Sequence, residues 1–255
     1  MIKIGLIGFG RTGKLVAGEI IKEPNCTLEW VIRSSPENEG SFASEILGLK
    51  TQQGKIVSKS TISEMPHFFS ENLVDVIVDF SDRSGLYVYN KAAERFAIKV
   101  VTAISRYQDL DIERIKELAT HTAVVLSPNI TVGINLILVL SEVLQKIIPD
   151  ADIEVVEEHF RDKPETSGTA IKIAERLGLD PAQHVNSIRV GGIVGKHEVI
   201  FGLPNQTLRL THESNNRAAF GRGAVFAAKW VTGKPAGLYD MESIIRDELV
   251  RNISI

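Results

Sequence analysis

The chain has 255 residues, enough for one large domain or two ordinary ones at a typical ~150 residues per domain. Its 44% of hydrophobic and 24% of charged residues are typical of globular proteins and argue against disorder. The formal net charge of −3 provides no positive field for nucleic acid, and the single cysteine, Cys26, excludes an intramolecular disulfide framework and disfavours a cysteine-based metal site.

Short apolar runs alternate with helical patterns through the first half of the chain. The runs predict strands at residues 2–7, 28–32, 74–80, 98–102 and 123–126, and the patterns between them predict helices at residues 14–22, 84–96 and 112–119. Residues 34–72 carry weak patterns interrupted by proline and glycine, and no element is assigned there. The alternation is typical of a parallel sheet with crossover helices, so we predict a Rossmann-like α/β cofactor domain over residues 1–129.

The pattern changes after residue 129. Helices are predicted at residues 132–148 and 169–177, with a strand at 153–159 between them, and three strands then follow without intervening helices, at 187–194, 197–201 and 206–214. Consecutive strands are typical of a mainly antiparallel sheet, so residues 130–237 are predicted to form a smaller α+β domain, with a helix at 218–232 covering that sheet. The last residues, about 238–255, are expected to pack back on the first domain.

Two features of the sequence bear on the cellular compartment. The first residues contain no signal-peptide pattern, and the longest apolar stretch, residues 132–148, is interrupted by polar side chains that suit a buried helix better than a membrane span. We therefore expect a cytoplasmic protein with neither a membrane nor a nucleic acid among its partners.

The first predicted strand leads into the segment Gly8-Phe9-Gly10-Arg11-Thr12-Gly13, which opens a helix. In dinucleotide-binding folds the first glycine of this pattern permits a tight turn, the second lets the backbone approach the pyrophosphate, and the third lets the helix pack on the strand. The free N–H groups and positive dipole end of the helix then face the phosphates. A dinucleotide cofactor is the preferred interpretation; a glycine-rich turn without a ligand is the alternative.

The end of the second predicted strand bears on which cofactor is bound. The strand ends at Arg33-Ser34-Ser35, where an acidic residue would favour NAD and an arginine accommodates the 2′-phosphate of NADP. Arg11, in the glycine loop, offers a second positive charge. These residues favour NADPH, with NADH possible, unless Arg33 is only a solvated surface cation.

Chemistry in the second domain concentrates between residues 157 and 170. His159 ends a predicted strand and offers the residue type best suited to exchange protons at neutral pH, and Lys163 adds a second proton donor or a fixed cation. Ser167-Gly168-Thr169 begins a helix, where hydroxyls and free N–H groups favour a carboxylate. The segment indicates a small anionic substrate; a charged surface turn with a helix cap is the alternative. His197 and His212, on later strands, are expected to be packed or surface residues.

The whole chain resembles the bacterial dihydrodipicolinate reductase family, also called 4-hydroxy-tetrahydrodipicolinate reductase. The matching motifs, in order, are the glycine loop 8–13, Val78-Asp79-Phe80-Ser81, residues 127–135, Glu158-His159 through Ser167-Gly168-Thr169-Ala170, residues 188–195, Thr211-His212 to Arg217, and residues 237–241. The resemblance implies an oxidoreductase of diaminopimelate and lysine biosynthesis that takes hydride from NADPH or NADH and reduces dihydrodipicolinate to tetrahydrodipicolinate. It further implies that the smaller domain binds this dicarboxylate and forms the contacts of a homotetramer.

The resemblance also implies roles for individual residues. His159 would be the proton donor, Lys163 its partner near a substrate carboxylate, and Ser167, Gly168 and Thr169 the residues that hold a carboxylate. The cofactor groove would be lined by Gly8, Phe9, Gly10, Arg11, Thr12, Gly13, Arg33, Ser34, Phe80, Ser81, Ala103, Ser105 and Asn129.

The chain departs from the family pattern at three places. Phe160 stands where the family has a second histidine, the stretch from Lys163 to Thr169 is altered and one residue shorter, and Ala103-Ile104-Ser105-Arg106 replaces a Gly-Thr-Thr-Gly loop near the nicotinamide. Two alternatives therefore stay open: a reductase of the same fold acting on another small imine or oxo acid, and a non-catalytic dinucleotide-binding sensor.

Overall fold

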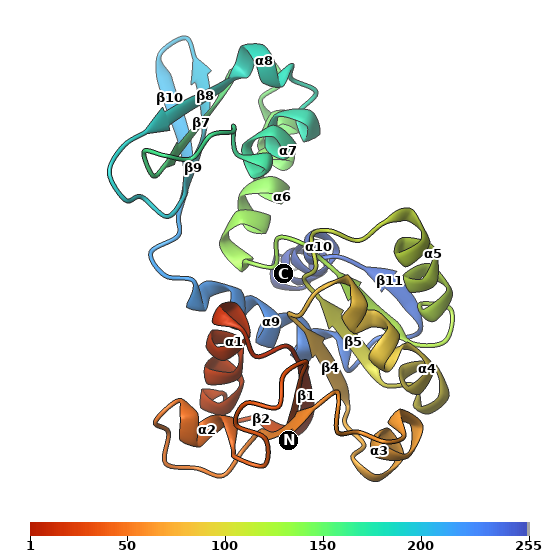
Figure 1. Cartoon of the computed structure of the whole chain (residues 1–255). Coiled ribbons are helices and arrows are strands. Elements are labelled where there is room, and N and C mark those ends of the chain that lie inside the picture. The colour runs from red at the N-terminus through yellow and green to blue at the C-terminus, as the bar shows by residue number, and fades with distance from the viewer. Residues whose placement is uncertain (254–255) are drawn as a thin grey trace. The chain divides into compact units, whose positions relative to one another are not determined.

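The computed structural model describes residues 1–253. The described residues divide into two compact units, one made of Met1–Thr131 with Arg217–Ile244, the other of Val132–Asn216 with residues 245–253 (Figure 1). The sequence predicts the boundary after residue 129, with residues of about 238–255 expected to pack on the first domain. The structure divides the chain after Thr131, returns to the first unit at Arg217, and groups residues 245–253 with the second unit.

The first unit is built on a seven-stranded sheet in the order β11-β6-β5-β4-β1-β2-β3, in which all neighbouring strands run parallel. Its strands are β1 (Ile2–Ile7), β2 (Cys26–Arg33), β3 (Lys55–Ser58), β4 (Val76–Asp79), β5 (Lys99–Thr102), β6 (Ala123–Leu126) and β11 (Gly237–Tyr239). Its helices are α1 (Arg11–Lys22), α2 (Ala43–Ile46), α3 (Met65–Glu71), the short 3-10 helix η1 (Arg83–Gly85), α4 (Leu86–Phe96), α5 (Asp109–Leu118), α9 (Ala218–Val231) and the start of α10 (Met241–Ile253). The predicted Rossmann-like domain is confirmed.

The order of the strands determines where a ligand can bind. β1 lies centrally, with β2 on one side and β4 on the other, so the chain leaves β1 in one direction and later returns on its opposite side. In open α/β sheets this arrangement leaves a crevice at the carboxyl ends of the two central strands, between the connections that diverge there. Gly8 follows β1 and Phe80 follows β4, and both therefore lie at this crevice.

The sheet is buried because its strands are almost entirely apolar. The first three residues of β4, Val76, Ile77 and Val78, are inaccessible to solvent, as expected for a parallel strand with helices on both faces. Trp30 of β2 packs edge-on against Phe69 of α3, with ring centroids 5.6 Å apart. Gly5 of β1 makes room for that indole, since a Cβ there would lie 2.1 Å from the ring. These contacts fix the strands that present the crevice.

The predicted place of α9 is wrong. This helix does not cover the second sheet but packs in the first unit against α1 and β5 (Figure 1). Its inward face is made of small residues, among them Gly221 and Gly223, which permit close helix packing. A Cβ on Gly223 would lie 1.9 Å from the carbonyl oxygen of Ile130. An apolar helical pattern shows that a face is buried without showing which sheet buries it, and this ambiguity caused the error.

The second unit contains a four-stranded mixed sheet in the order β10-β9-β7-β8. β7 pairs antiparallel with β9 and parallel with β8, and β9 pairs antiparallel with β10. The elements are α6 (Val132–Ile147), β7 (Asp152–His159), α7 (Gly168–Arg176), α8 (Pro181–His184), β8 (Val185–Arg189), β9 (Lys196–Leu203) and β10 (Gln206–Glu213). The prediction of a mainly antiparallel sheet is confirmed, with β8 as the one parallel addition. No helix among residues 1–253 is long and apolar enough to cross a membrane.

Alternation along β7 directs its side chains to opposite faces of the sheet. Ile153 and Val155 join a core with residues of α6 and α7. Glu157 and His159 follow at the same spacing of two and are also buried. Two polar side chains thus continue an apolar face at the end of the strand.

We expect Gly223→Ala to destabilise the protein, because the added methyl would collide with a backbone carbonyl that cannot rotate away. Gly18→Ala in α1 is the matched control, since its Cβ would meet only the Leu47 side chain at 3.9 Å. The control should gain roughly 0.5–1 kcal/mol from the usual helix preference for alanine. Urea denaturation of both variants measures this, and an equal gain in both would contradict the packing described for α9.

Candidate active site

A first cavity of about 280 Å³ lies at the carboxyl ends of β1 to β4. Its lining residues come from the turns after these strands and from the start of α4: Ile7, Gly8, Phe9, Gly10, Ile32, Arg33, Ser34, Lys59, Phe80, Ser81, Asp82, Ser84, Gly85 and Val88. Four segments that are distant in sequence therefore meet at the crevice that the strand order creates.

The glycine loop has the shape that a bound phosphate requires. Gly8 has φ +95°, and a Cβ there would lie 2.8 Å from the backbone of Phe80, so only glycine fits. A Cβ on Gly13 would lie 2.3 Å from the carbonyl oxygen of Gly8, which shows how closely α1 approaches the loop. Gly10, the N-cap of α1, has no atom within 4 Å of an added Cβ and no side-chain cap. Open space thus adjoins the free N–H groups of the helix.

Two cations, Arg33 and Lys59, line this cavity. Arg33 ends β2, and its guanidinium donates to the carbonyl oxygen and the carboxylate of Glu37, at 2.9 and 2.8 Å. The Arg33 side chain is 15% exposed, whereas that of Glu37 is 68% exposed. Lys59 follows β3, and its N–H donates to the carbonyl oxygen of Arg33 at 2.7 Å. Lys59 lies in the stretch where no element was assigned from sequence, so it was missed as a site residue.

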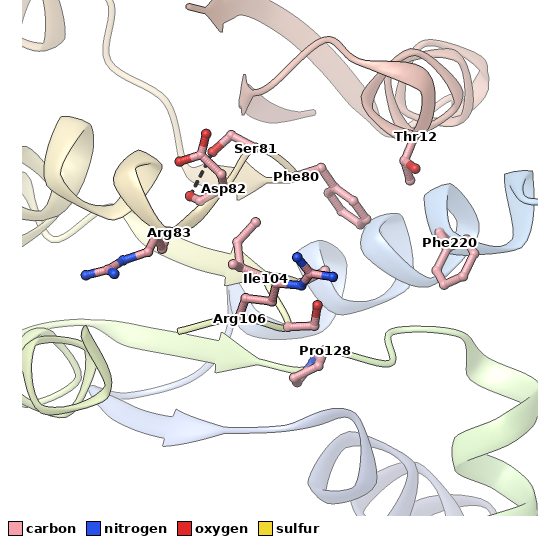
Figure 2. A pocket seen from close by; sticks show the side chains of 11 residues that line it. Thr12, Phe80, Ser81, Asp82, Arg83, Ile104, Arg106, Pro128 and Phe220 are labelled. Atoms are coloured by element: carbon pink, nitrogen blue, oxygen red, sulfur yellow. Dashed lines mark hydrogen bonds between the residues drawn. The ribbon is translucent and has the colours of Figure 1, made fainter. Parts of the chain in front are cut away.

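A second cavity of about 440 Å³ lies at the carboxyl ends of β4, β5 and β6 (Figure 2). It is lined by Thr12, Phe80, Ser81, Asp82, Arg83, Ala103, Ile104, Ser105, Arg106, Pro128 and Phe220. The side chain of Arg83 points away from the ring of Phe80 in Figure 2, and its guanidinium pairs with Asp111 at 3.2 Å. Phe80, Ser81 and Asp82 line both cavities, so the two adjoin across β4.

The pair of cavities fits a dinucleotide. An elongated ligand with a central pyrophosphate needs a pocket on each side of the glycine loop, and the crevice provides both. Most residues predicted for the cofactor groove line one of the cavities. Three do not: Gly13 packs against Gly8, Arg11 is exposed on α1, and Asn129 accepts a hydrogen bond from the Ser127 hydroxyl through its backbone oxygen.

Asp79 determines how the shared segment is held. It is the last residue of β4 and is fully buried, and its Oδ1 accepts hydrogen bonds from the Ser81 N–H at 2.9 Å and the Ser81 hydroxyl at 2.6 Å. Burial raises the pKa of Asp79 to about 6, although the hydrogen bonds from Ser81 favour the carboxylate. This buried acid therefore anchors a residue that lines both cavities.

The second unit contains a separate polar cluster around His159, at the end of β7. The His159 side chain is 10% exposed, and its Nδ1 lies 2.5 Å from Oε2 of Glu157, whose side chain is fully buried. An ionised carboxylate only accepts hydrogen bonds, so the imidazole must donate through Nδ1. Its Nε2 is then left for other partners. An ideal Cβ on Gly195 would lie 3.0 Å from Nε2, so a larger residue there would crowd this atom.

Four further donors hold the Glu157 carboxylate. Arg189 of β8 donates to Oε2 at 2.8 Å and to Oε1 at 2.6 Å, and Oε1 also accepts from the Ser187 hydroxyl at 2.6 Å and the Ser167 N–H at 3.1 Å. Burial by itself would raise the pKa of Glu157, but the hydrogen bonds from Arg189, Ser187, His159 and Ser167 outweigh it and lower the pKa to about 2. Glu157 is therefore ionised at any ordinary pH.

The start of α7 belongs to the same cluster. Ser167 is the N-cap of this helix, and its hydroxyl lies 2.8 Å from Nε2 of His197. The ring of His197 contacts that of His159 edge-on, with centroids 5.3 Å apart. Burial lowers the pKa of His197 to about 4, and the His159 ring acts in the same direction. His197 is therefore a neutral partner that orients the Ser167 hydroxyl.

The loop from Phe160 to Thr166 connects His159 to Ser167. Lys163 donates through Nζ to the carbonyl oxygen of Glu165 at 2.7 Å, so its ammonium caps the loop in this structure rather than contacting His159. Gly168 is exposed, with no atom within 4 Å of an added Cβ, and Thr169 is partly buried. Phe160 is 44% exposed. The loop leaves the N-terminus of α7 accessible beside His159.

Four residues of this cluster lie outside the set predicted from sequence: Glu157, Ser187, Arg189 and His197. The alternation along β7 was a signal for Glu157, because a spacing of two places it on the face of His159. Arg189 is 32 residues away from Glu157 in sequence, and only the parallel pairing of β7 with β8 brings them together. Residues 1–253 contain no group of three or more His, Cys, Asp or Glu side chains placed to hold a metal ion.

Comparisons with known protein families cover both units. Residues 2–130 match the family described as "Dihydrodipicolinate reductase, N-terminus", and residues 133–245 match "Dihydrodipicolinate reductase, C-terminus". The two matches meet close to the division between the two units after Thr131.

Individual relatives extend over nearly the full length. The 4-hydroxy-tetrahydrodipicolinate reductase of Pseudoalteromonas translucida is 30% identical over 95% of this chain and 97% of its own length. That of Buchnera aphidicola subsp. Schizaphis graminum is 28% identical over 96% and 97%. Among solved structures, a dipicolinate-bound dihydrodipicolinate reductase from Paenisporosarcina sp. TG-14 has a TM-score of 0.78 at 20% identity, covering 96% of this chain and 99% of that chain. This structural likeness supports the fold.

The buried Asp79 predicts a specific pH dependence of stability. Its pKa is raised from 3.8 to about 6 on folding, so the folded state holds a proton between these values that the unfolded state has lost. The free energy of unfolding should therefore fall as pH rises from about 4 to 6, by on the order of 1–3 kcal/mol from this group. Asp79→Asn keeps the accepting oxygen and should lack this component. Urea denaturation between pH 4 and 8 measures this pH-dependent component of the free energy of unfolding. Asp150→Asn, at an exposed position, is the control and should keep the component. An Asp79→Asn variant with the same pH dependence as the wild type would rule out the role of burial.

Proposed function

The chain belongs to the dihydrodipicolinate reductase family, and we propose that it reduces 4-hydroxy-tetrahydrodipicolinate, or the dihydrodipicolinate formed from it, to tetrahydrodipicolinate. The family consists of NAD(P)H-dependent oxidoreductases of lysine and diaminopimelate biosynthesis, and the chain is such an enzyme. The single observation that carries the proposal is the hydrogen-bonded pair of His159 and Glu157, whose carboxylate also binds the Ser167 N–H at the start of α7.

The first unit holds the cofactor in this proposal. When bound, the nicotinamide cofactor supplies the hydride. The free N–H groups at Gly10 and the N-terminus of α1 bind its pyrophosphate, the cavity beside Arg33 and Ser34 takes the adenosine, and the cavity with Ala103 and Ser105 takes the nicotinamide. Asp79 keeps Ser81 in place between the two.

The second unit provides the proton. Reduction at a ring carbon conjugated with the imine would leave an enamine-like carbon beside it, which must be protonated. We assign this step to Nε2 of His159, because Nδ1 is occupied by Glu157 and because Gly195 leaves Nε2 uncrowded. Protein groups therefore add positioning and a proton, while the redox chemistry belongs to the cofactor.

The N-terminus of α7 suits a substrate carboxylate. Ser167, Gly168 and Thr169 begin the helix, where backbone N–H groups and hydroxyls favour an anion. Gly168 is exposed, so a ligand can reach the backbone there. The Lys163 ammonium donates a hydrogen bond to the Glu165 carbonyl, and we propose that it turns to the substrate as a second cation. These features support a dicarboxylate as the substrate.

We further propose a preference for NADPH over NADH. Arg33 and Lys59 together place two positive charges at the ends of β2 and β3, where the adenosine ribose would lie. The exposed Glu37 carboxylate that now binds Arg33 is a partner that a 2′-phosphate can replace. Arg11 is exposed on α1 and lines neither cavity.

The assembly and the compartment are part of the proposal. The four-stranded sheet packs one face on α6 and α7, and its other face carries Ile188 and Ile200 among ion pairs such as Lys196 with Glu158. Apolar side chains surrounded by paired charges are typical of a subunit contact, which supports a homotetramer formed through this unit. A biosynthetic enzyme of this kind works in the cytoplasm.

A coupled assay tests the reaction directly. Dihydrodipicolinate synthase product and NADPH are supplied to the full chain, and the absorbance of the reduced cofactor is followed. We expect turnover by the wild type, and a kcat about 10²–10⁴-fold lower in His159→Gln, because a general acid is lost. His184→Gln is the control, since His184 of α8 pairs with Glu154 of β7 and should be dispensable.

Failure of the wild type with NADPH binding intact would favour another small imine or oxo acid as substrate. Binding without turnover of any such compound would favour a dinucleotide sensor. Wild-type rates in His159→Gln would remove that residue from the mechanism.

Cofactor preference is tested by Arg33→Asp. Loss of a charge-assisted hydrogen bond to the 2′-phosphate should weaken NADPH roughly 10- to 100-fold, while NADH changes little. Titration of intrinsic fluorescence with each cofactor measures both dissociation constants. Lys50→Asp, an exposed position outside both cavities, makes the same change in net charge and should affect neither cofactor. Equal losses for NADPH and NADH would contradict a phosphate contact at Arg33.

A further inference from the structure

The Glu157 carboxylate joins three segments of the second unit. It binds Nδ1 of His159 on its own strand, the side chains of Ser187 and Arg189 on β8, and the N–H of Ser167 at the start of α7. We propose that Glu157, held by Arg189, is the positioning residue of the proton transfer, which selects Nε2 of His159 as the reacting atom and fixes the substrate-carboxylate site relative to it. The inference rests on the proposed role of His159.

The tautomer follows from the donor count. The Glu157 carboxylate presents only lone pairs, and the guanidinium of Arg189 presents only N–H groups. Nδ1 of His159 must therefore carry a proton at its distance of 2.5 Å from Oε2. In the neutral ring Nε2 then carries a lone pair, and in the charged ring it carries the proton that can leave. A carboxyl group that orients a histidine in this way stabilises the imidazolium without itself being protonated.

Arg189 holds the Glu157 carboxylate in this position. Two of its nitrogens bind the two oxygens of Glu157, in the bidentate geometry that suits a guanidinium and a carboxylate. The buried negative charge is thereby balanced and remains an acceptor. The Ser187 hydroxyl binds one of the same oxygens, so the carboxylate cannot turn without losing several bonds.

The same guanidinium organises the loop that leads to α7. Arg189 donates through Nε to the carbonyl oxygen of Lys163 at 3.0 Å and through a terminal nitrogen to that of Glu165 at 2.9 Å. Glu157 in turn binds the N–H of Ser167. One ion pair therefore fixes both ends of the loop between the proton donor and the carboxylate site. A shift of the Glu157–Arg189 pair would move His159 and Ser167 together.

A purely structural ion pair would make a different prediction. A buried salt bridge often adds little net stability, but removal of one partner leaves the other charge unpaired and destabilises the fold. With a purely structural role, this loss of stability would leave the chemistry unchanged. A positioning role predicts a change in the pH profile of kcat. The pH profile of kcat therefore distinguishes a positioning role from a purely structural one.

The test is Glu157→Gln in the full chain, assayed in the same coupled assay. The amide nitrogen of glutamine, placed opposite Nδ1, would donate to it and reverse the tautomer. We expect kcat to fall about 10²–10⁴-fold, as for a general acid in the wrong protonation state, with the KM for NADPH unchanged. The pH at which kcat falls should also be lower, since the imidazolium loses its negative partner.

Glu158→Gln is the matched control, with the same change one residue along the strand. Glu158 faces the other side of the sheet and pairs with Lys196, so kcat and its pH profile should stay as in the wild type. A Glu157→Gln variant with kcat within threefold of the wild type and an unchanged pH profile would overturn the proposal. If that variant does not fold, Glu157→Asp takes its place, because the shorter carboxylate withdraws from Nδ1, and a wild-type kcat there would also overturn it.

Parallel measurements separate this inference from the proposed function. No turnover by the wild type means that the reaction is wrong, and wild-type rates in His159→Gln mean that the proton donor is wrong. A large loss in His159→Gln with none in Glu157→Gln rejects only the role of Glu157.

Discussion

A buried carboxylate that must be surrounded by donors is the constraint on which the second unit depends. Glu157 lies on the inward face of β7, where an unpaired charge would be very costly. Its donors come from β8, from the start of α7 and from His159. Satisfying one acceptor therefore sets the register of a parallel strand pair, the start of a helix and the orientation of an imidazole.

The first unit has the opposite requirement, because backbone N–H donors at the start of α1 must stay available for a ligand. The N-terminus of α1 has no side-chain cap, and the turn into it is possible only because Gly8 has a positive φ and Gly13 lets the helix approach. Asp79, buried like Glu157, has few hydrogen bonds and a raised pKa, whereas Glu157 has many and a lowered one. Environment, rather than residue type, thus decides which acid is charged.

Much of the fold and part of the candidate site could be predicted from the sequence. The glycine loop, the strand ending at His159 and the helix start at Ser167 are local patterns, and local patterns fix local structure. Lys59 was missed because β3 is only four residues long and gives no periodicity. The Glu157–Arg189 pair was missed because strand pairing, and not spacing in sequence, brings the residues together. The predicted position of α9 was wrong for a similar reason, because a helix face made of small residues can pack closely on many surfaces.

The most direct test of the account is the protonation state of the His159 ring in the full chain. Nitrogen NMR of the protein labelled with ¹⁵N in its histidine rings, assigned by comparison with His159→Gln, distinguishes the two neutral tautomers. At a pH where the ring is neutral, the account predicts a proton on Nδ1, bonded to Glu157, and a bare Nε2. A ring protonated on Nε2, or an equal mixture of the two forms, would contradict the claim that the buried carboxylate selects the reacting atom.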